Sequence, residues 1–510
     1  MFNSREWYDK MFNSNSRGLY EILEPLAHLK KEVEPYASIV IDSIKDAIPR
    51  PDPDKSYWYK GELPTLKGTV VTIADAFSTV HPNYLLVAAT FVAAFFILYI
   101  KMQYPFWNQI PALHVYDWHR RFLYSEKPYV IHLVPKKTKY YESKLVSTCK
   151  FRDMRGDQQI ELTKMLQNHY LPSDRVFCSI QLPDLVAQCA DAMVSVYNEV
   201  EEDITVNLDI ENIREDSIQK TSRVRKIEGF VSSRRVNTHI SLGTPKDRYI
   251  MQEPANYIDY LCFDKTYSSS QKIRKLFQTH EYNERMRVSG PNITLFKKEV
   301  ELCDAIVPLV EYDSLTFYLR YKIEPAKLPG KFHIVRVQKE HLRHLHDWME
   351  RIAALQEDIG FRVSVTMETG DLIHLLQTNQ MFAYVLRGPD PEVKTRNEIV
   401  YAIYFFRNAH MKYEDLDGGD TLHSVAAFSN TNDFELYFLG FVWAVREARK
   451  DFTGTETKMI MIDDIGHLRG IAKLWMGNHN VVLRTKCAYY FCNYVVPRSP
   501  YKAEEVNMLI

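Results

Sequence analysis

The sequence predicts a protein of mixed helix and strand, of the α/β or α+β class. The first observation is that short β-like runs alternate with segments whose apolar residues recur at helical spacing. The second is that the pattern forms two halves, Ser143–Lys327 and a half starting near His333, each ordered helix, strand, strand, helix, strand. The third is a composition of 46% hydrophobic and 25% charged residues, which is typical of a folded chain with ample core.

Individual elements follow from local patterns. In the first half, the charged segment Val200–Arg225 is expected to form a looped insertion. In the second half, the run HLRHLHDWMERIAAL has the spacing of a helix. Strands are predicted at Phe382–Gly388, Glu398–Asn408 and Thr457–Asp463.

Charge and cysteine content exclude several classes of function. A formal net charge of -1 gives no electrostatic support for binding nucleic acid. The seven cysteines contain no CxxC pair, so we expect neither a zinc site nor a disulfide framework. We therefore expect the protein to reside in a reducing compartment. The histidines at 341, 344 and 346 and the acidic run at 413–420 lack the spacing of metal ligands, so no metal is predicted.

The N-terminal region divides into two parts. Residues 1–83 have apolar positions at helical spacing, with breaks at Pro25 and Pro35, and we expect a partly helical region. The segment 84–100, YLLVAATFVAAFFILYI, is uncharged and close to the lower length limit for crossing a bilayer. The sequence therefore predicts one transmembrane helix here, with a buried core helix as the alternative.

The run YIDYLCFDK, Tyr257 to Lys265, predicts a short strand whose two faces are both largely apolar. It is followed by the polar turn TYSSSQK and then by a charged segment that reads as a helix through Leu276 and Phe277. A strand, a hydroxyl-rich turn and a helix together present backbone amides to an anion. The segment is thus a candidate anion-binding site.

This run resembles a signature of eukaryotic protein N-myristoyltransferases. Three further segments resemble that family in the same order along the chain: YPFWNQIP (Tyr104–Pro111), GFVSSRRVNTHI (Gly229–Ile240) and YYFCNYVVP from Tyr489 towards the end. The resemblance covers roughly Gln103 to Ile510. It implies two fused acetyltransferase-like (GNAT) units related by pseudo-two-fold symmetry, with acyl-CoA binding in 101–327 and peptide binding in 328–510.

The resemblance also implies the residues of the reaction. The backbone amides of Tyr260 and Leu261 would form the oxyanion hole, and the carboxylate of Ile510 would be the base that frees the glycine amine. The last residues, VNMLI, are apolar, which favours a tail threaded into the core. The alternatives are a plain sheet strand and a disordered terminus.

Residues for coenzyme A are implied in two places. The first is the N-terminal element, with Tyr104, Phe106, Trp107 and Asn108. The second is the turn that grips the pyrophosphate in the family, with Ser268, Ser269, Ser270 and Lys272. Here the arginines of the family are missing from the turn, and Lys272, Arg274 and Lys275 would have to compensate. Each lost charge-assisted contact costs about 1.5–3 kcal/mol.

Residues for the peptide are implied by the same resemblance, and two of them are acidic where the family has neutral side chains. Asp259 replaces an asparagine and Asp304 replaces a threonine, so either one would hold the glycine ammonium or act as base. The full set implied to face the peptide is Tyr170, Asp174, Asp259, Asp304, Tyr318 and Asn430.

The sequence thus predicts a single-pass membrane protein whose large domain faces the cytosol. Its expected activity is transfer of myristate from myristoyl-CoA, as co-substrate, to an N-terminal glycine of a protein, without any other cofactor. The alternative is a catalytically impaired, membrane-tethered relative that kept a structural or binding role. The eroded pyrophosphate turn favours this alternative.

Overall fold

The computed structural model divides the chain into two units, Met1–Pro105 and Phe106–Ile510. It describes residues 82–117, 120, 127–171, 175–198, 202–204, 222–224, 226–242, 249–300, 302–319, 325–338, 341, 345, 361–389, 398–414, 419–452 and 457–510. The predicted helical region 1–83 therefore lies almost wholly outside the described residues. So does most of the helix predicted from His341.

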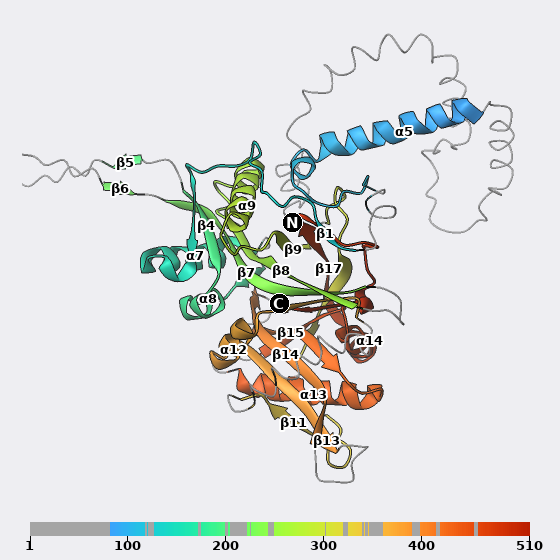
Figure 1. The fold of residues 1–510 in the computed structure, drawn as a ribbon. Coiled ribbons are helices and arrows are strands. Elements are labelled where there is room, and N and C mark those ends of the chain that lie inside the picture. Colours follow the sequence, from blue (N-terminus) through green and yellow to red (C-terminus); the bar gives the residue numbers. More distant parts are fainter. Residues whose placement is uncertain are drawn as a thin grey trace, which may run out of the picture. The chain divides into compact units, whose positions relative to one another are not determined.

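The described part of the first unit is the helix α5 (Pro82–Gln103), drawn in blue in Figure 1. Within the described residues, no helix combines the length and the apolar character needed to cross a membrane. The 17 uncharged residues 84–100 rise about 26 Å as a helix, less than the ~30 Å hydrocarbon core. The predicted transmembrane helix, and with it the single-pass membrane location, is therefore wrong.

The second unit begins with short elements and then builds the first half of a large sheet. The strands of this half are β1 (Tyr129–Val130), β2 (Val146–Lys150), β3 (Val176–Cys178), β4 (Met193–Asn198), β5 (Glu202–Ile204), β6 (Ser222–Val224), β7 (Ile227–Leu242), β8 (Tyr249–Phe263), β9 (Ile293–Glu299) and β10 (Val310–Tyr318). Of these, β1, β5 and β6 belong to separate two-stranded sheets. Its helices are η1 (Trp107–Gln109), η2 (Phe151–Asp153), α7 (Gly156–His169), α8 (Leu182–Gln188) and α9 (Ser270–Arg285). The predicted looped insertion contains the β5–β6 ladder, and its other residues lie outside the described part.

The second half supplies the remaining elements. Its strands are β11 (His333–Arg336), β12 (Val363–Met367), β13 (Met381–Pro389), β14 (Glu398–Tyr413), β15 (Asp420–Ser429), β16 (Thr457–Asp463), β17 (Val481–Cys492), β18 (Tyr494–Val495) and β19 (Val506–Leu509). Its helices are α12 (Thr369–Gln377), α13 (Phe434–Asp451), α14 (Leu468–Asn478) and η5 (Ala503–Glu505). The three strands predicted in this half are confirmed as β13, β14 and β16.

The two halves repeat one arrangement. In the first, β7 and β8 are antiparallel, α9 follows, and β9 lies parallel to β8. In the second, β14 and β15 are antiparallel, α13 follows, and β16 lies parallel to β15. A register shift in each antiparallel pair leaves Asp259 of β8 and Val425 of β15 without a partner opposite, as in a β-bulge, and β14–β15 has a second shift between Asn408 and Lys412.

Exchanged strands join the halves into one sheet of 15 described strands. β10 leaves the first half to pair with β16, and β17 leaves the second half to pair with β9. The central order is therefore β15–β16–β10–β17–β9–β8–β7. Beyond β7, strand β12 adds on, and β19 pairs in parallel with β12, which carries the end of the chain into the sheet.

Apolar burial explains why the end of the chain is held. Val506 and Leu509 are fully buried and Met508 is 3% exposed. Val506, Met508 and Ile510 pack in a cluster with residues of β7, β9, β10 and β17, including Leu295 and Tyr489. Burial of side chains of this size stabilises by about 1.5–3 kcal/mol each. The predicted threading of the tail into the core is thus seen in the structure.

Candidate active site

The β-bulge in β8 is the centre of the candidate site. Ser232 of β7 lies opposite Tyr260 and Ser233 lies opposite Ile258, so that Asp259 is the extra residue. The amide of Tyr260 donates to the hydroxyl Oγ of Ser232 at 3.3 Å. A bulge turns backbone groups away from the regular ladder, and a long bond to a hydroxyl is easily exchanged for a stronger acceptor.

The strands β8 and β9 separate at the same place. Their parallel pairing joins Ala255–Ile258 to Ile293–Phe296 and stops immediately before Asp259. Tyr260 and Leu261, the two residues predicted to stabilise an oxyanion, are half-buried just beyond this point. The hydroxyl of Tyr260 donates to Oε1 of Gln188 at 2.6 Å, and this bond fixes the ring beside α8.

Asp259 forms a buried ion pair with an arginine that the sequence reasoning missed. Nη2 of Arg234 lies 3.0 Å from Oδ1 of Asp259, and the two side chains are 9% and 13% exposed. Burial raises the pKa of Asp259, and the opposing charges of Arg234 and Arg407 offset this effect only in part. The arginine pair SSRRV on a predicted strand was the signal, because an arginine on a buried strand needs a partner.

The buried end of the chain meets a second arginine. Ile510 is 3% exposed, and Nη1 of Arg407 donates to its oxygen at 3.4 Å. Nε of Arg407 donates to Nδ1 of His423 at 3.2 Å, and Nε2 of His423 lies 3.3 Å from Oδ2 of Asp463. Since Nε of arginine can only donate, Nδ1 of His423 accepts, and the ring proton of the neutral histidine is on Nε2, facing Asp463.

Electrostatics keep this chain of contacts in one charge state. Burial lowers the pKa of His423, although Asp463 acts in the opposite direction. Burial acts to raise the pKa of Asp463, but Lys297 and His423 outweigh it and hold the pKa well below its ordinary value. A neutral His423 between a cationic Arg407 and an anionic Asp463 follows from these shifts.

The predicted coenzyme A residues of the N-terminal element are mostly interior. Phe106 and Trp107 are 4% and 6% exposed, and the indole of Trp107 stacks on Phe296 of β9 at 5.5 Å and 9°. Asn108 is exposed and accepts from the hydroxyl of Tyr116. Tyr104 belongs to the first unit, where its amide continues α5 by donating to Ile100.

The predicted pyrophosphate turn is occupied by contacts of the protein itself. Both oxygens of Glu228 accept from Nζ of Lys272, at 2.9 and 2.6 Å, and Glu228 is 1% exposed. Ser269 caps α9 by accepting the amide of Lys272 at 3.2 Å. Ser268 is half-buried and Ser270 is buried. The cation expected to bind phosphate therefore already has a buried carboxylate partner.

The residues predicted to face a peptide lie on several different elements. Tyr170, at the end of α7, meets the ring of Tyr260 edge-on at 5.5 Å, next to Asp259. Asp304 is exposed in the loop before β10, and Tyr318 is 50% exposed at the end of β10. The amide of Asn430, between β15 and α13, donates to the carbonyl of Tyr401. Asp174 lies outside the described residues.

Comparisons with known proteins place the fold. No protein-family model and no curated protein sequence matches the chain. The structure of Saccharomyces cerevisiae N-myristoyltransferase with bound myristoyl-CoA and inhibitors superimposes with a TM-score of 0.55 and 11% identity, covering 81% of this chain and 95% of the yeast chain. A second structure of the yeast enzyme with bound myristoyl-CoA gives 0.53 and 11%, covering 78% and 94%.

At this identity the likeness concerns the fold. It shows that this chain shares the fold of the yeast enzyme, as the sequence resemblance led us to expect, whereas the transmembrane part of the prediction is overturned. The yeast structures contain myristoyl-CoA, which is a statement about the yeast enzyme.

Proposed function

We propose that this protein is an acyltransferase that moves a myristoyl group from a thioester to the amine of an N-terminal glycine in a peptide or protein. The observation that carries the proposal is the position of the β8 bulge. It puts the amides of Tyr260 and Leu261 where β8 and β9 separate, within a fold shared with the yeast N-myristoyltransferase. Myristoyl-CoA is the donor that the resemblance implies.

The proposed chemistry assigns a role to each group. The amides of Tyr260 and Leu261 stabilise the oxyanion that forms when the amine attacks the thioester carbon, a contribution of about 3–4 kcal/mol for a preorganised donor. Asp259 holds the incoming ammonium beside this position. The carboxylate of Ile510 takes the proton, and Arg407 orients it through the 3.4 Å contact. The amide C–N bond forms, the C–S bond breaks, and the thiol leaves protonated.

A second candidate function is supported by the Lys272–Glu228 pair. With its cation neutralised, the turn before α9 lacks the charge that grips a pyrophosphate. The second candidate is therefore a non-catalytic relative that kept the fold and binds an acyl chain or a peptide without turnover.

One experiment separates the two candidates. The protein is incubated with labelled myristoyl-CoA and labelled myristoyl-pantetheine, each with a library of peptides that begin with glycine. Amide-linked label on glycine peptides, and none on the same peptides with acetylated N-termini, is the expected result. A folded protein that transfers from neither donor to any peptide would contradict the enzymatic function and favour the binding relative.

A further inference from the structure

The turn between β8 and α9 is closed by its own hydrogen bonds. The amides of Thr266 and Tyr267 donate to Asp264, at 2.9 Å to the side chain and 3.1 Å to the carbonyl. The amide of Lys265 donates to Nδ1 of His169 at 3.3 Å. Burial acts to raise the pKa of Asp264, but its hydrogen bonds with Thr266 outweigh this and lower the pKa, so this carboxyl group stays ionised.

The cations at the start of α9 are also committed. Lys272 binds Glu228 through both carboxylate oxygens, and Lys275 binds Oε2 of Glu142 at 3.0 Å. A pyrophosphate at Lys272 would have to compete with the nearly inaccessible carboxylate of Glu228, which already accepts two bonds from the ammonium and neutralises its charge. The turn is therefore unsuited to the nucleotide part of a coenzyme A thioester, whereas a pantetheine arm makes no such demand.

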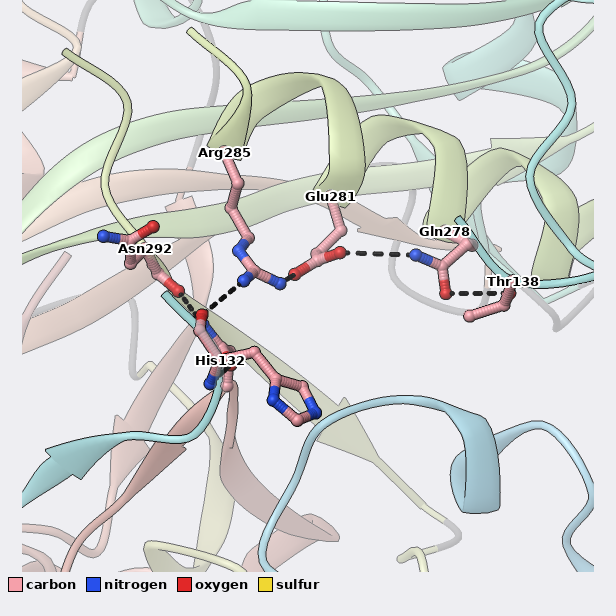
Figure 2. Close-up of polar contacts among 7 residues, drawn as sticks. His132, Thr138, Gln278, Glu281, Arg285 and Asn292 are labelled. Atoms are coloured by element: carbon pink, nitrogen blue, oxygen red, sulfur yellow. Dashed lines mark hydrogen bonds and ion pairs between the residues drawn. The ribbon is translucent and has the colours of Figure 1, made fainter. Parts of the chain in front are cut away.

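A segment rich in lysine lies along α9, and we call residues 131–145 the strap. Its inner contacts fall on one face of the helix, because their α9 partners are spaced by three or four residues: Lys275, Gln278, Thr279, Tyr282 and Arg285. Figure 2 shows Arg285 bound to the carbonyl of His132 and to Glu281, and Gln278 reaching towards Thr138.

These inner contacts are partly buried and most are short, and together they hold the strap against α9. Nη2 of Arg285 donates to the carbonyl of His132 at 2.7 Å, and Nη1 donates to Oε1 of Glu281 at 2.7 Å (Figure 2). Asn493 closes the other side, since its Nδ2 donates to the same carbonyl of His132 at 2.9 Å. The amide of Glu142 donates to Oγ1 of Thr279 at 2.9 Å, in the second half of the helix.

The outer side of the strap is basic and partly apolar. Lys136, Lys137 and Lys139 are exposed, and Leu133 and Val134 are 75% and 72% exposed. Glu142 is the strap's one acid, and it is paired inward with Lys275. A surface segment in which exposed lysines follow two exposed aliphatic side chains is complementary to an acidic protein with an apolar contact point.

We propose that the acyl donor is a thioester on the pantetheine arm of an acidic carrier protein that docks on the strap, rather than free myristoyl-CoA. The inference rests on the proposed acyl transfer and names its donor. The carrier contributes its negative surface to the lysines, and its arm enters where β8 and β9 separate. The same bonds form and break as with coenzyme A, and the carrier thiol is released.

The test compares three donors with the whole protein and a glycine peptide: myristoyl-CoA, myristoyl-pantetheine and a myristoylated acidic acyl carrier protein. The carrier-bound donor is expected to exceed myristoyl-CoA in kcat/KM by about tenfold, with the excess falling as salt rises. Myristoyl-CoA and myristoyl-pantetheine are expected to agree within about threefold, because the nucleotide gains no charge-assisted contact.

Variants assign the effect to the residues. Lys136→Glu with Lys139→Glu should lower kcat/KM for the carrier by about tenfold and leave myristoyl-pantetheine unchanged. The matched control, Lys327→Glu with Lys331→Glu, reverses two exposed lysines near the junction of the two halves, outside the strap, and should change neither donor. Glu228→Gln should raise the use of myristoyl-CoA relative to myristoyl-pantetheine, since it frees the charge of Lys272.

Two results would overturn the carrier-protein inference, and a third would refute the proposed acyl transfer. A preference of about tenfold or more for myristoyl-CoA over myristoyl-pantetheine, with no gain from the carrier, would overturn the inference and leave the proposed transfer intact. Binding of the strap lysines to anionic vesicles without any effect on the carrier would also overturn it. Absence of transfer from all three donors would refute the proposed function itself.

Discussion

Arg407 binds the oxygen of Ile510, the last residue of the sequence, and on its other side binds His423. β14 thereby fixes the end of β19 at the place where the two halves meet around β7 and β12. The end of the chain is held by a specific polar contact as well as by apolar burial.

Loss of the contact between Arg407 and Ile510 should lower the free energy of unfolding. Arg407→Met leaves the oxygen of Ile510 and Nδ1 of His423 without their donor, and each buried acceptor left in this way costs about 1–3 kcal/mol. Urea unfolding of the variant should show a lower midpoint with an unchanged slope. Arg484→Met, at a side chain that is 57% exposed, is the control and should stay within about 0.5 kcal/mol. Equal effects of the two substitutions would contradict the assigned contact.

The role proposed for Ile510 is tested by lengthening the chain. Residues appended after Ile510 convert its carboxylate into a peptide bond and place the terminal carboxylate outside the cluster that holds Ile510. Transfer should therefore be lost, whereas binding of a myristoyl donor should remain. Transfer rate and donor binding are measured on the same preparation, with circular dichroism to verify folding. An extended chain with full activity would exclude Ile510 as the base and leave Asp259 as the acceptor of the proton.

The two acidic replacements should behave differently. Asp259→Asn leaves the buried Arg234 without its counter-charge, and breaking a buried pair in this way costs about 3–5 kcal/mol. Asp304 is exposed, so Asp304→Asn should be nearly neutral in stability and in transfer. Unfolding free energies of the two variants check this. A destabilisation by Asp304→Asn as large as that by Asp259→Asn would show that the assigned environments are wrong.

Stability should fall in mild acid because of His280. This ring lies between Oγ of Ser195 at 2.8 Å and Oγ of Ser233 at 2.9 Å, and burial lowers its pKa to about 3. The unfolded chain takes up a proton near pH 6.5 and the folded chain does not, so this contribution is lost as pH falls from about 6.5 to about 3.

The measurement is the free energy of unfolding between pH 6 and pH 5. His280 should contribute a slope of about 1.4 kcal/mol per pH unit towards the acid end of this window, and His280→Gln should remove it. A variant with the same slope as the parent protein would show that His280 titrates normally in the fold.

A close approach of strands should make Gly229 intolerant of a side chain. A Cβ added there would lie 2.5 Å from the ring of Phe263, its partner across β7 and β8. Overpacking of this kind costs about 1–3 kcal/mol for Gly229→Ala. Gly477→Ala, where nothing lies within 4 Å and the helix α14 gains a better helix former, should be neutral or stabilising. Thermal unfolding of both variants decides the matter, and a neutral Gly229→Ala would contradict the packing.

Local pattern was enough for much of the fold. The alternation of apolar residues predicted β13, β14 and β16 within a few residues of their bounds, and the turn chemistry of TYSSSQK predicted the start of α9. The exchange of β10 and β17 between halves was not predictable in this way, because their partners are set by contacts between distant parts of the chain. The periodicity of apolar residues predicts which face of a strand is buried, but it does not predict which other strand lies beside it.

The buried polar contacts of the site could not be predicted from the sequence either. Arg234, Arg407, His423 and Glu228 look like ordinary charged positions until the register brings their partners to them. The resemblance implied that Lys272 binds phosphate, but nothing in the sequence around Lys272 indicates that Glu228 of β7 pairs with it. Membrane insertion was inferred from the apolar stretch 84–100 alone, at the lower limit of length, and this expectation was wrong.

The most direct test is a crystal structure of the protein with a glycine peptide and a non-hydrolysable ketone analogue of the myristoyl thioester, in which a methylene separates the sulfur from the carbonyl. The acyl chain is expected between β8 and β9, with its carbonyl oxygen within hydrogen-bond distance of the amides of Tyr260 and Leu261. The peptide amine is expected beside Asp259 and Ile510. An acyl chain bound elsewhere, or a bound donor whose carbonyl does not reach the β8 bulge, would contradict the proposed acyl transfer at this site.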